Sequence, residues 1–206
     1  KELMDLKEDG SFKLNMKYFN YATGLTMTNK RFSNLFGHPV RDPKKDLLND
    51  FHMDIASSIQ AVTEEIVLRL TKNIANEYKI KNLCLAGGVA LNCVANGKIL
   101  REKIFDNIWI QPAAGDAGGS LGAALAYWHH ELRKPRETFK DQMKGAYLGP
   151  KFSEHQIEKQ LRQLKGKYHK KNSNEISSIV AKELSNSKTV GWFQGRMEFG
   201  PRALGG

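Results

Sequence analysis

Residues 83–92, Leu-Cys-Leu-Ala-Gly-Gly-Val-Ala-Leu-Asn, decide the fold of this chain. Their short apolar run predicts a buried strand, the paired glycine predicts a tight turn, and the pattern of residues 91–102 predicts a helix. The same order is repeated immediately, because a strand predicted at 108–110 leads into Pro-Ala-Ala-Gly-Asp at 112–116 and then into another helix. Two successive strand–turn–helix units are typical of an α/β fold. In such folds ligands bind at the carboxyl ends of the strands, where these turns lie.

The N-terminal part of the chain predicts a strand and a long helix. Residues 11–19 alternate between apolar and polar side chains after a turn at Asp9-Gly10, which predicts a half-buried strand. Residues 20–50 are broken by glycine and proline and predict an irregular connection with one short helix. Apolar residues then recur every three or four positions, which predicts an amphipathic helix over 54–78.

The C-terminal part predicts a second, incomplete domain. Periodicity is lost over 133–150, so we place a domain boundary between residues 145 and 146. Beyond it, Ser153 and Gln156 have the spacing of a capping box, which predicts the start of a helix. A further helix is predicted over 175–184 and a strand over 189–193. The chain begins at Lys1 without a methionine and stops inside a glycine-rich loop, so we expect it to be a piece of a longer protein.

Composition restricts the partners. The net charge of +10 favours anionic ligands such as nucleotides or acyl phosphates, although scattered lysines on a solvated surface explain it equally well. No aromatic-rich basic signature is present, so nucleic acid is not an expected partner. No stretch approaches the roughly 18 apolar residues that a membrane helix needs, so no membrane partner is expected. Cys84 and Cys93 lack zinc-ligand spacing and are expected to be buried free thiols in a reducing cytoplasm.

The first candidate site is the glycine turn at the end of the first predicted strand. Gly87 and Gly88 would bring backbone N–H groups and a helix N-terminus against a ligand, which favours phosphate or ribose oxygens. Asn92 would project from the first turn of the helix, where its amide can bond the same ligand. A tight turn needs glycine in any case, so a purely structural turn is the alternative.

The second candidate site is the loop around Asp116. A carboxylate among glycines at a strand end is a suitable ligand for Mg²⁺, Mn²⁺ or Fe²⁺ beside a phosphate. Gly115 and Gly118 would shape this loop. The alternative is that Asp116 serves only as the N-cap of the helix that follows.

The third candidate site is the terminal loop, residues 195–206. Arg196 and Arg202 lie among four glycines and a proline, and arginine offers a planar fork that matches phosphate oxygens. They would clamp an acyl phosphate or the adenylate made from it, and surface arginines in a flexible loop are the alternative. The sequence contains no P-loop, no nucleophile elbow and no His-Glu-x-x-His motif, so P-loop ATPases, α/β-hydrolases and zincins are not supported.

Together these motifs resemble one family, the O-carbamoyltransferases of the nodulation and antibiotic-biosynthesis type. The resemblance covers nearly the whole chain and is carried by Gly24 with Gly37-His38-Pro39, and by residues 54–60, 83–96, 112–119 and 195–205. It implies that residues 1–145 form the later half of an actin-like ATPase and sugar-kinase lobe, which has a ribonuclease-H-like fold. Residues 146–206 would open a second α/β domain that looks like threonylcarbamoyl-adenylate synthases.

The resemblance also implies an activity. Carbamoyl phosphate and ATP would give carbamoyl adenylate, and the carbamoyl group would pass to a hydroxyl of a sugar, an antibiotic or a related small molecule. The first candidate site would bind ATP, Asp116 would be one ligand of a divalent metal (Fe²⁺, Mn²⁺ or Mg²⁺), and Arg196 and Arg202 would be catalytic. The isolated piece is expected to be inactive. A truncated sheet would expose apolar edges, which makes a homodimer a hypothesis.

Three alternatives stay open at this point. A transferase of threonylcarbamoyl groups to tRNA and a sugar kinase belong to the same superfamily as the first lobe. Neither relative needs the terminal arginine loop, which favours the carbamoyltransferase. A non-catalytic nucleotide-binding module is the third alternative.

Overall fold

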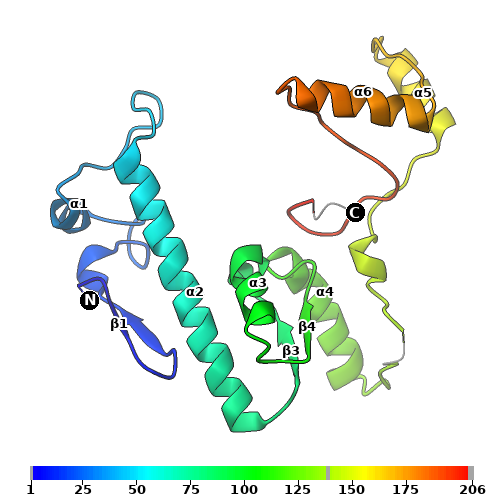
Figure 1. Cartoon of the computed structure of the whole chain (residues 1–206). Helices are drawn as coiled ribbons and strands as arrows, with labels where there is room; N and C mark the ends of the chain where they lie inside the picture. Colours follow the sequence, from blue (N-terminus) through cyan, green and yellow to red (C-terminus); the bar gives the residue numbers. More distant parts are fainter. Residues whose placement is uncertain (1, 138–139, 204–206) are drawn as a thin grey trace. The chain divides into compact units, whose positions relative to one another are not determined.

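The computed structural model describes residues 2–137 and 140–203, and the chain divides into two compact units, Lys1–Gln111 and Pro112–Gly206. Figure 1 shows helices together with two short sheets, one of which is a parallel pair joined through α3, so the predicted mixed α/β class is confirmed. Each sheet has two strands, β1 with β2 and β3 with β4. The actin-like architecture of the first lobe stays a prediction. The units are described separately below.

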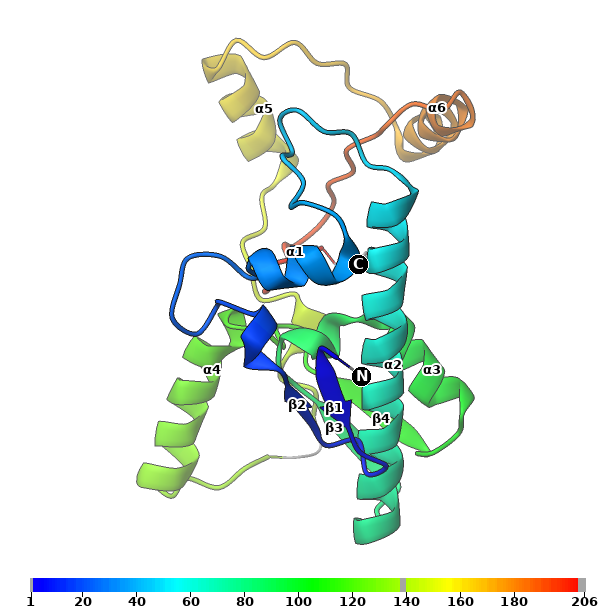
Figure 2. The same cartoon turned by 90° about the vertical axis from the view of Figure 1, so that its left-hand side faces the viewer.

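Unit 1 begins with a hairpin that lies along the long helix. Strand β1 (Met4–Leu6) pairs antiparallel with β2 (Phe12–Leu14), and the predicted turn at Asp9-Gly10 is confirmed. Arg69 of the helix donates a 3.0 Å hydrogen bond to the carbonyl of Lys7 in the hairpin (Figure 2). The prediction that one strand continues to residue 19 is wrong, because Met16–Tyr18 forms a 3₁₀ turn. The side chain of Asn15 caps this turn by accepting from the backbone of Lys17 at 3.2 Å, which stops the strand.

Two helices follow, as predicted. Helix α1 (Lys30–Phe36) lies within the irregular connection, and α2 (Asp50–Tyr78) is the long amphipathic helix. Helix α2 starts four residues before the predicted position, because Asn49 caps it and His52 completes a capping box. Phe36 packs edge-on against Phe51 with ring centroids 6.4 Å apart, so the two helices share an aromatic contact.

The core of unit 1 lies between α2, the parallel pair and helix α3. Strands β3 (Asn82–Leu85) and β4 (Asn107–Ile110) pair in parallel, with Leu85 opposite Ile110. Helix α3 (Cys93–Arg101) covers them, and Ile99 is fully buried against Leu83 and Phe105. The prediction of one helix from residue 91 is corrected, since Gly88–Leu91 forms a separate 3₁₀ turn.

The prediction that both cysteines are buried is wrong. Cys84 and Cys93 are free and exposed. Side chains alternate along a strand, so Cys84 points away from the face on which Leu83 packs. Trp109 lies opposite Cys84 on strand β4, and 45% of its surface is exposed. Among the described residues, only one face of this sheet is therefore packed.

In its described residues, unit 2 contains three α-helices, a short 3₁₀ helix (Lys144–Ala146) and a long terminal loop. Helix α4 (Ala117–Ala126) continues into a π turn, Tyr127–Glu131. Helix α5 (Glu154–Gln163) starts with the predicted capping box of Ser153 and Gln156, and α6 (Ser173–Ser185) contains the further predicted helix. The predicted strand at 189–193 is wrong, because no neighbouring strand pairs with this segment in the described part of the chain. Apolar alternation alone forms no strand without a hydrogen-bonded partner.

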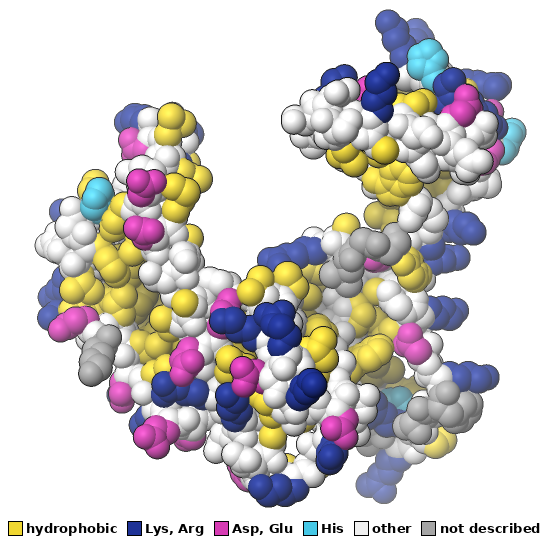
Figure 3. Space-filling view, viewed as in Figure 1, with side chains coloured by type: hydrophobic (Ala, Val, Ile, Leu, Met, Phe, Trp, Pro, Cys, Tyr) yellow, Lys and Arg dark blue, Asp and Glu magenta, His cyan; other side chains and the backbone are white. Residues whose placement is uncertain are grey.

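The surface agrees with the composition. In the face seen in Figure 3, Lys and Arg side chains are dispersed among acidic and apolar ones. Several large apolar side chains are exposed, including Leu25, Leu47 and Val40. None of the helices in residues 2–137 and 140–203 has the length and apolar character to cross a membrane.

Candidate functional site

The glycine turn has an open, glycine-specific backbone. Strand β3 ends at Leu85, and Gly87 then adopts φ +94° and ψ 163°, a conformation that side-chain-bearing residues do not tolerate. A Cβ atom placed on Gly87 or on Gly88 would meet nothing within 4 Å. The turn therefore leaves room for a ligand beside its backbone, as the sequence predicts. That a nucleotide fills this room stays a prediction.

Asn92 caps helix α3 and is held by a second amide. Its Oδ1 accepts from the backbone of Ala95 at 3.1 Å and from Gln60 Nε2 at 3.2 Å, and its Nδ2 donates to Gln60 Oε1 at 2.9 Å. An amide offers two acceptor and two donor positions, so a single N–H of Asn92 is left for a ligand. Gln60 belongs to the sequence motif 54–60, and no local pattern in that motif indicates its contact with Asn92.

Gln60 joins Asn92 to an ion pair in which the carboxylate is buried and the lysine is partly exposed. Its Nε2 also donates to Glu64 Oε1 at 2.7 Å, and Glu64, only 6% exposed, pairs with Lys98 of α3. The ammonium of Lys98, helped by Gln60, holds the pKa of Glu64 below its ordinary value of 4.5. Helix α2 is thus fixed to α3 beside the glycine turn by one chain of charge and amide contacts.

The contacts of Glu64 with Lys98 and Gln60 predict that the stability of the folded state depends on pH. A lowered carboxyl pKa in the folded state contributes stability above the unfolded value of about 4.5, and the contribution disappears as the pH falls through the folded pKa. Glu64→Gln is therefore expected to reduce stability at pH 7 and to flatten its decline below pH 4.5. Urea unfolding between pH 3 and pH 7 measures this. The control is Glu65→Gln, which removes an exposed pair with Arg69; an equal effect in both variants would contradict the prediction.

The Asp116 loop is shaped by a close contact. Asp116 occupies the N-cap position of α4, but its exposed side chain makes no capping hydrogen bond, so the structure gives no support to the cap alternative. Gly118 donates its backbone N–H to Gly115 at 3.1 Å, and a Cβ on Gly118 would lie 2.1 Å from the carbonyl oxygen of Ala113. Gly115 and Gly118 therefore shape this loop.

Asp116 stands without further metal ligands in the described chain. Among residues 2–137 and 140–203, no group of three or more histidine, cysteine, aspartate or glutamate side chains is arranged to hold a metal ion. The unbonded carboxylate has the chemistry of one oxygen ligand, but a complete site needs several. The metal prediction therefore applies to the whole protein and stays a prediction.

The terminal loop is fastened to residues 146–151. Arg196 donates from Nη1 to the carbonyl of Gly149 at 2.7 Å. The backbone N–H of Gly149 donates to the carbonyl of Met197 at 2.9 Å, and that of Met197 donates to the carbonyl of Pro150 at 3.0 Å. Phe199 donates its N–H to Ala146 at 2.7 Å. One N–H of Arg196 is thus occupied by the fold, while Arg202 has no recorded side-chain partner in the described part of the chain. Both arginines line a cavity of about 460 Å³. Residues 204–206 of the motif lie outside the described residues.

Within unit 2, the terminal loop packs against residues 112 and 113. A Cβ on Gly200 would lie 3.5 Å from the carbonyl oxygen of Pro112 and 3.8 Å from Cα of Ala113. The part of the terminal loop that carries Arg196 and Arg202, here called the arginine loop, therefore lies against the segment that leads to Asp116. Gly87, Gly88 and Asn92 belong to unit 1.

The fold and these loops define a class of protein. It is an α/β protein with a glycine turn at the end of strand β3 and an arginine-containing loop over residues 195–206. The chain belongs to the carbamoyltransferase family, because the sequence model of the carbamoyltransferase N-terminus matches residues 1–125. The model of the carbamoyltransferase C-terminus matches residues 181–206, which contain the arginine loop. The boundary expected between residues 145 and 146 lies between these matches and stays a prediction.

Individual relatives agree with the family match. An uncharacterized protein of Synechocystis sp. is 58% identical over 207 residues, covering 99% of this chain and 34% of that protein. Nodulation protein NolO of Bradyrhizobium diazoefficiens is 41% identical over 155 residues, covering 75% of this chain and 28% of that protein. Nodulation protein U of Rhizobium fredii is 33% identical over 126 residues, covering 61% of this chain and 19% of that protein. The chain spans about a third or less of the length of these relatives.

Proposed function

We propose that the whole protein is an ATP-dependent O-carbamoyltransferase. It would form carbamoyl adenylate from carbamoyl phosphate, water and ATP with release of phosphate and pyrophosphate, and would then transfer the carbamoyl group to a hydroxyl of a small molecule with release of AMP. The family match supports carbamoyl transfer. The observation that carries the finer proposal is the packing of the arginine loop against the segment that leads to Asp116. This arrangement places cationic and anionic groups in neighbouring loops, as a phosphate with a bound metal would require.

Each candidate residue has a role in this proposal. The open backbone at Gly87 and Gly88, with the remaining N–H of Asn92, would bind the nucleotide. Arg202 would stabilise the charge that develops when the phosphate of the acyl donor is displaced. Arg196 would hold the loop through Gly149 and offer its remaining donors to the same phosphate.

A divalent metal would be held by Asp116 together with ligands from outside the described residues. When bound, the ion would polarise the carbamoyl oxygen. The exposed thiols of Cys84 and Cys93 favour a reducing compartment, so we place the reaction in the cytoplasm.

The test is ATP–pyrophosphate exchange by the whole protein, measured with and without carbamoyl phosphate. We expect exchange only when carbamoyl phosphate is present, because the adenylate forms from it. Arg202→Ala should lower the rate about 100-fold, the usual effect of removing one donor to a transition-state oxyanion. The matched control is Arg162→Ala, which removes an exposed arginine from α5. Bound ATP without exchange would contradict the proposal and favour a nucleotide-binding module.

A further inference from the structure

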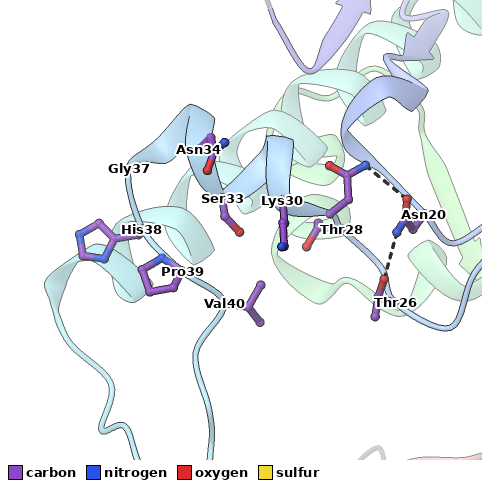
Figure 4. A pocket seen from close by; sticks show the side chains of 11 residues that line it. Asn20, Thr26, Thr28, Lys30, Ser33, Asn34, Gly37, His38, Pro39 and Val40 are labelled. Carbon is purple, nitrogen blue, oxygen red and sulfur yellow. Dashed lines mark hydrogen bonds between the residues drawn. The ribbon is translucent and has the colours of Figure 1, made fainter.

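The asparagine that caps helix α1 has all of its hydrogen-bonding positions occupied. Asn29 Oδ1 accepts from the backbone of Arg31 at 2.9 Å and from that of Phe32 at 3.4 Å. Its Nδ2 donates to the carbonyl of Lys17 at 3.1 Å and to Asn20 Oδ1 at 3.3 Å, beside the open cavity drawn in Figure 4. An amide has two donor and two acceptor positions, so the fold uses all four positions of Asn29. Asn29 is therefore a structural cap.

The asparagine that caps helix α3 differs from Asn29 in one donor. Asn92 Oδ1 accepts from the backbone of Ala95 and from Gln60, and one N–H of its Nδ2 donates to Gln60. No partner is recorded for the second N–H in the described part of the chain. Asn92 follows the 3₁₀ turn Gly88–Leu91 directly, and its backbone N–H donates to the carbonyl of Val89 at 2.9 Å. An unused donor is therefore attached to the end of the glycine turn.

The orientation of the two amides is imposed at both ends by groups that act in only one way. The backbone N–H of Ala95 can only donate, so it requires the oxygen of Asn92. The carboxylate of Glu64 can only accept, so it requires the nitrogen of Gln60, which donates to it at 2.7 Å. The oxygen of Gln60 then accepts from Asn92 Nδ2 at 2.9 Å. Both ends select the same orientation, in which Asn92 keeps a donor and no acceptor for a ligand.

Glu64 acts as a pure acceptor because basic side chains of α3 keep it ionised. Its side chain is buried and pairs with the ammonium of Lys98. The hydrogen bonds from Lys98 and Gln60 lower the pKa of Glu64, and the positive charge of Arg101 lowers it further. A protonated Glu64 could donate as well as accept, and it would then no longer impose one orientation on Gln60. The ion pair with α3 therefore maintains the orientation of the amides at neutral pH.

We propose that Glu64 is a positioning residue of the candidate nucleotide site: acting through Gln60, it holds Asn92 so that the glycine turn offers its ligand a hydrogen-bond donor and no acceptor at this point. The inference rests on the proposed binding of ATP at this turn, and it adds the chemistry of one contact. The ligand atom next to Asn92 must be an acceptor, such as a phosphate or ribose oxygen or an unprotonated ring nitrogen. The need to orient Asn92 also gives a reason for a buried carboxylate between α2 and α3, since burying a charge is costly.

The first test is calorimetric titration of the whole protein with ATP, after circular dichroism has shown that each variant is folded. Asn92→Ala should weaken ATP binding about tenfold, the effect of losing one hydrogen bond. Glu64→Gln should weaken it about fivefold, because glutamine can donate to Gln60 as well as accept from it. In the double variant, Glu64→Gln should cause no loss beyond that of Asn92→Ala. A general loosening of α2 against α3 would weaken ATP binding in both backgrounds, and that result would overturn the proposal.

The second test needs no nucleotide. The whole protein is labelled with a nitrogen isotope in its asparagines, and the side-chain NH₂ signals of Asn92 are identified by their loss in Asn92→Ala. We expect Glu64→Gln to shift or broaden these NMR signals. The matched control, Glu65→Gln, removes an exposed pair with Arg69 and should leave both the signals and the ATP affinity unchanged.

The two tests separate this proposal from the proposed function. Unchanged Asn92 signals in Glu64→Gln would overturn the positioning role, whatever the protein does with ATP. Signals that respond as expected, in a protein that binds no ATP, would support the positioning of Asn92 and contradict the proposed nucleotide site.

Discussion

Replacing Gly118 by alanine is expected to destabilise unit 2 by about 3 kcal/mol, the upper part of the range for forcing an extra methyl group into a packed site. The new Cβ would lie 2.1 Å from the carbonyl oxygen of Ala113, a backbone atom that cannot swing away. Either α4 or the loop before it must move. Asp116, two residues earlier, would move with them, so pyrophosphate exchange by the whole protein should fall as well.

The adjacent glycine supplies the control for this experiment. A Cβ on Gly119 would meet nothing within 4 Å, although Gly119 lies in the same helix. Gly119→Ala is therefore expected to be neutral or to stabilise by up to about 1 kcal/mol, because alanine is the better helix former. Hydrogen exchange of residues 117–126 measures the local stability of both variants. Equal stability of the two variants would show that the loop before α4 does not pack as described.

Truncating Ile99 to alanine is expected to cost about 3 kcal/mol of the free energy of unfolding of unit 1. Ile99 is 0% exposed and packs against Leu83 and Phe105, so the truncation leaves a cavity beneath the sheet. Asn92 is the N-cap of α3, so a loosened α3 should also release Asn92 from Gln60. We therefore expect weaker ATP binding as well as a lower urea midpoint.

A variant of the neighbouring residue is the control, because it makes a similar truncation in the same helix without removing a buried side chain. Leu100 follows Ile99 in α3 but is 62% exposed. Leu100→Ala is expected to change the free energy of unfolding by less than about 1 kcal/mol, since little apolar area is lost. Urea unfolding followed by circular dichroism compares the two variants. A cost for Ile99→Ala as small as that for Leu100→Ala would mean that the core does not lie between α3 and β3.

Local chemistry explains why much of the secondary structure was predictable. Apolar side chains every three or four residues predict α2, and a serine three residues before a glutamine predicts the start of α5. Both signals act within a few residues of chain. The glycine turn after β3 was predictable for the same reason, because the φ of Gly87 is a property of one residue.

Contacts between distant segments were not predictable in this way. The segment 189–193 has the composition of a strand but finds no partner strand in the described chain, and Cys84 lies on the face of β3 that is not packed. The amide pair of Gln60 and Asn92 joins residues 32 positions apart. No periodic pattern encodes such a pair, since it depends on how α2 packs against α3.

The sequence by itself therefore determined the α/β class, the start of α5 and the three glycine-rich candidate loops, because propensity, capping and turn chemistry act locally. Only the tertiary structure decided that Asn92 is held by Gln60, that Arg196 is anchored to Gly149, and that the arginine loop lies against Pro112. The physical reason is that each of these contacts joins segments far apart in the chain, and close packing alone determines which of them meet.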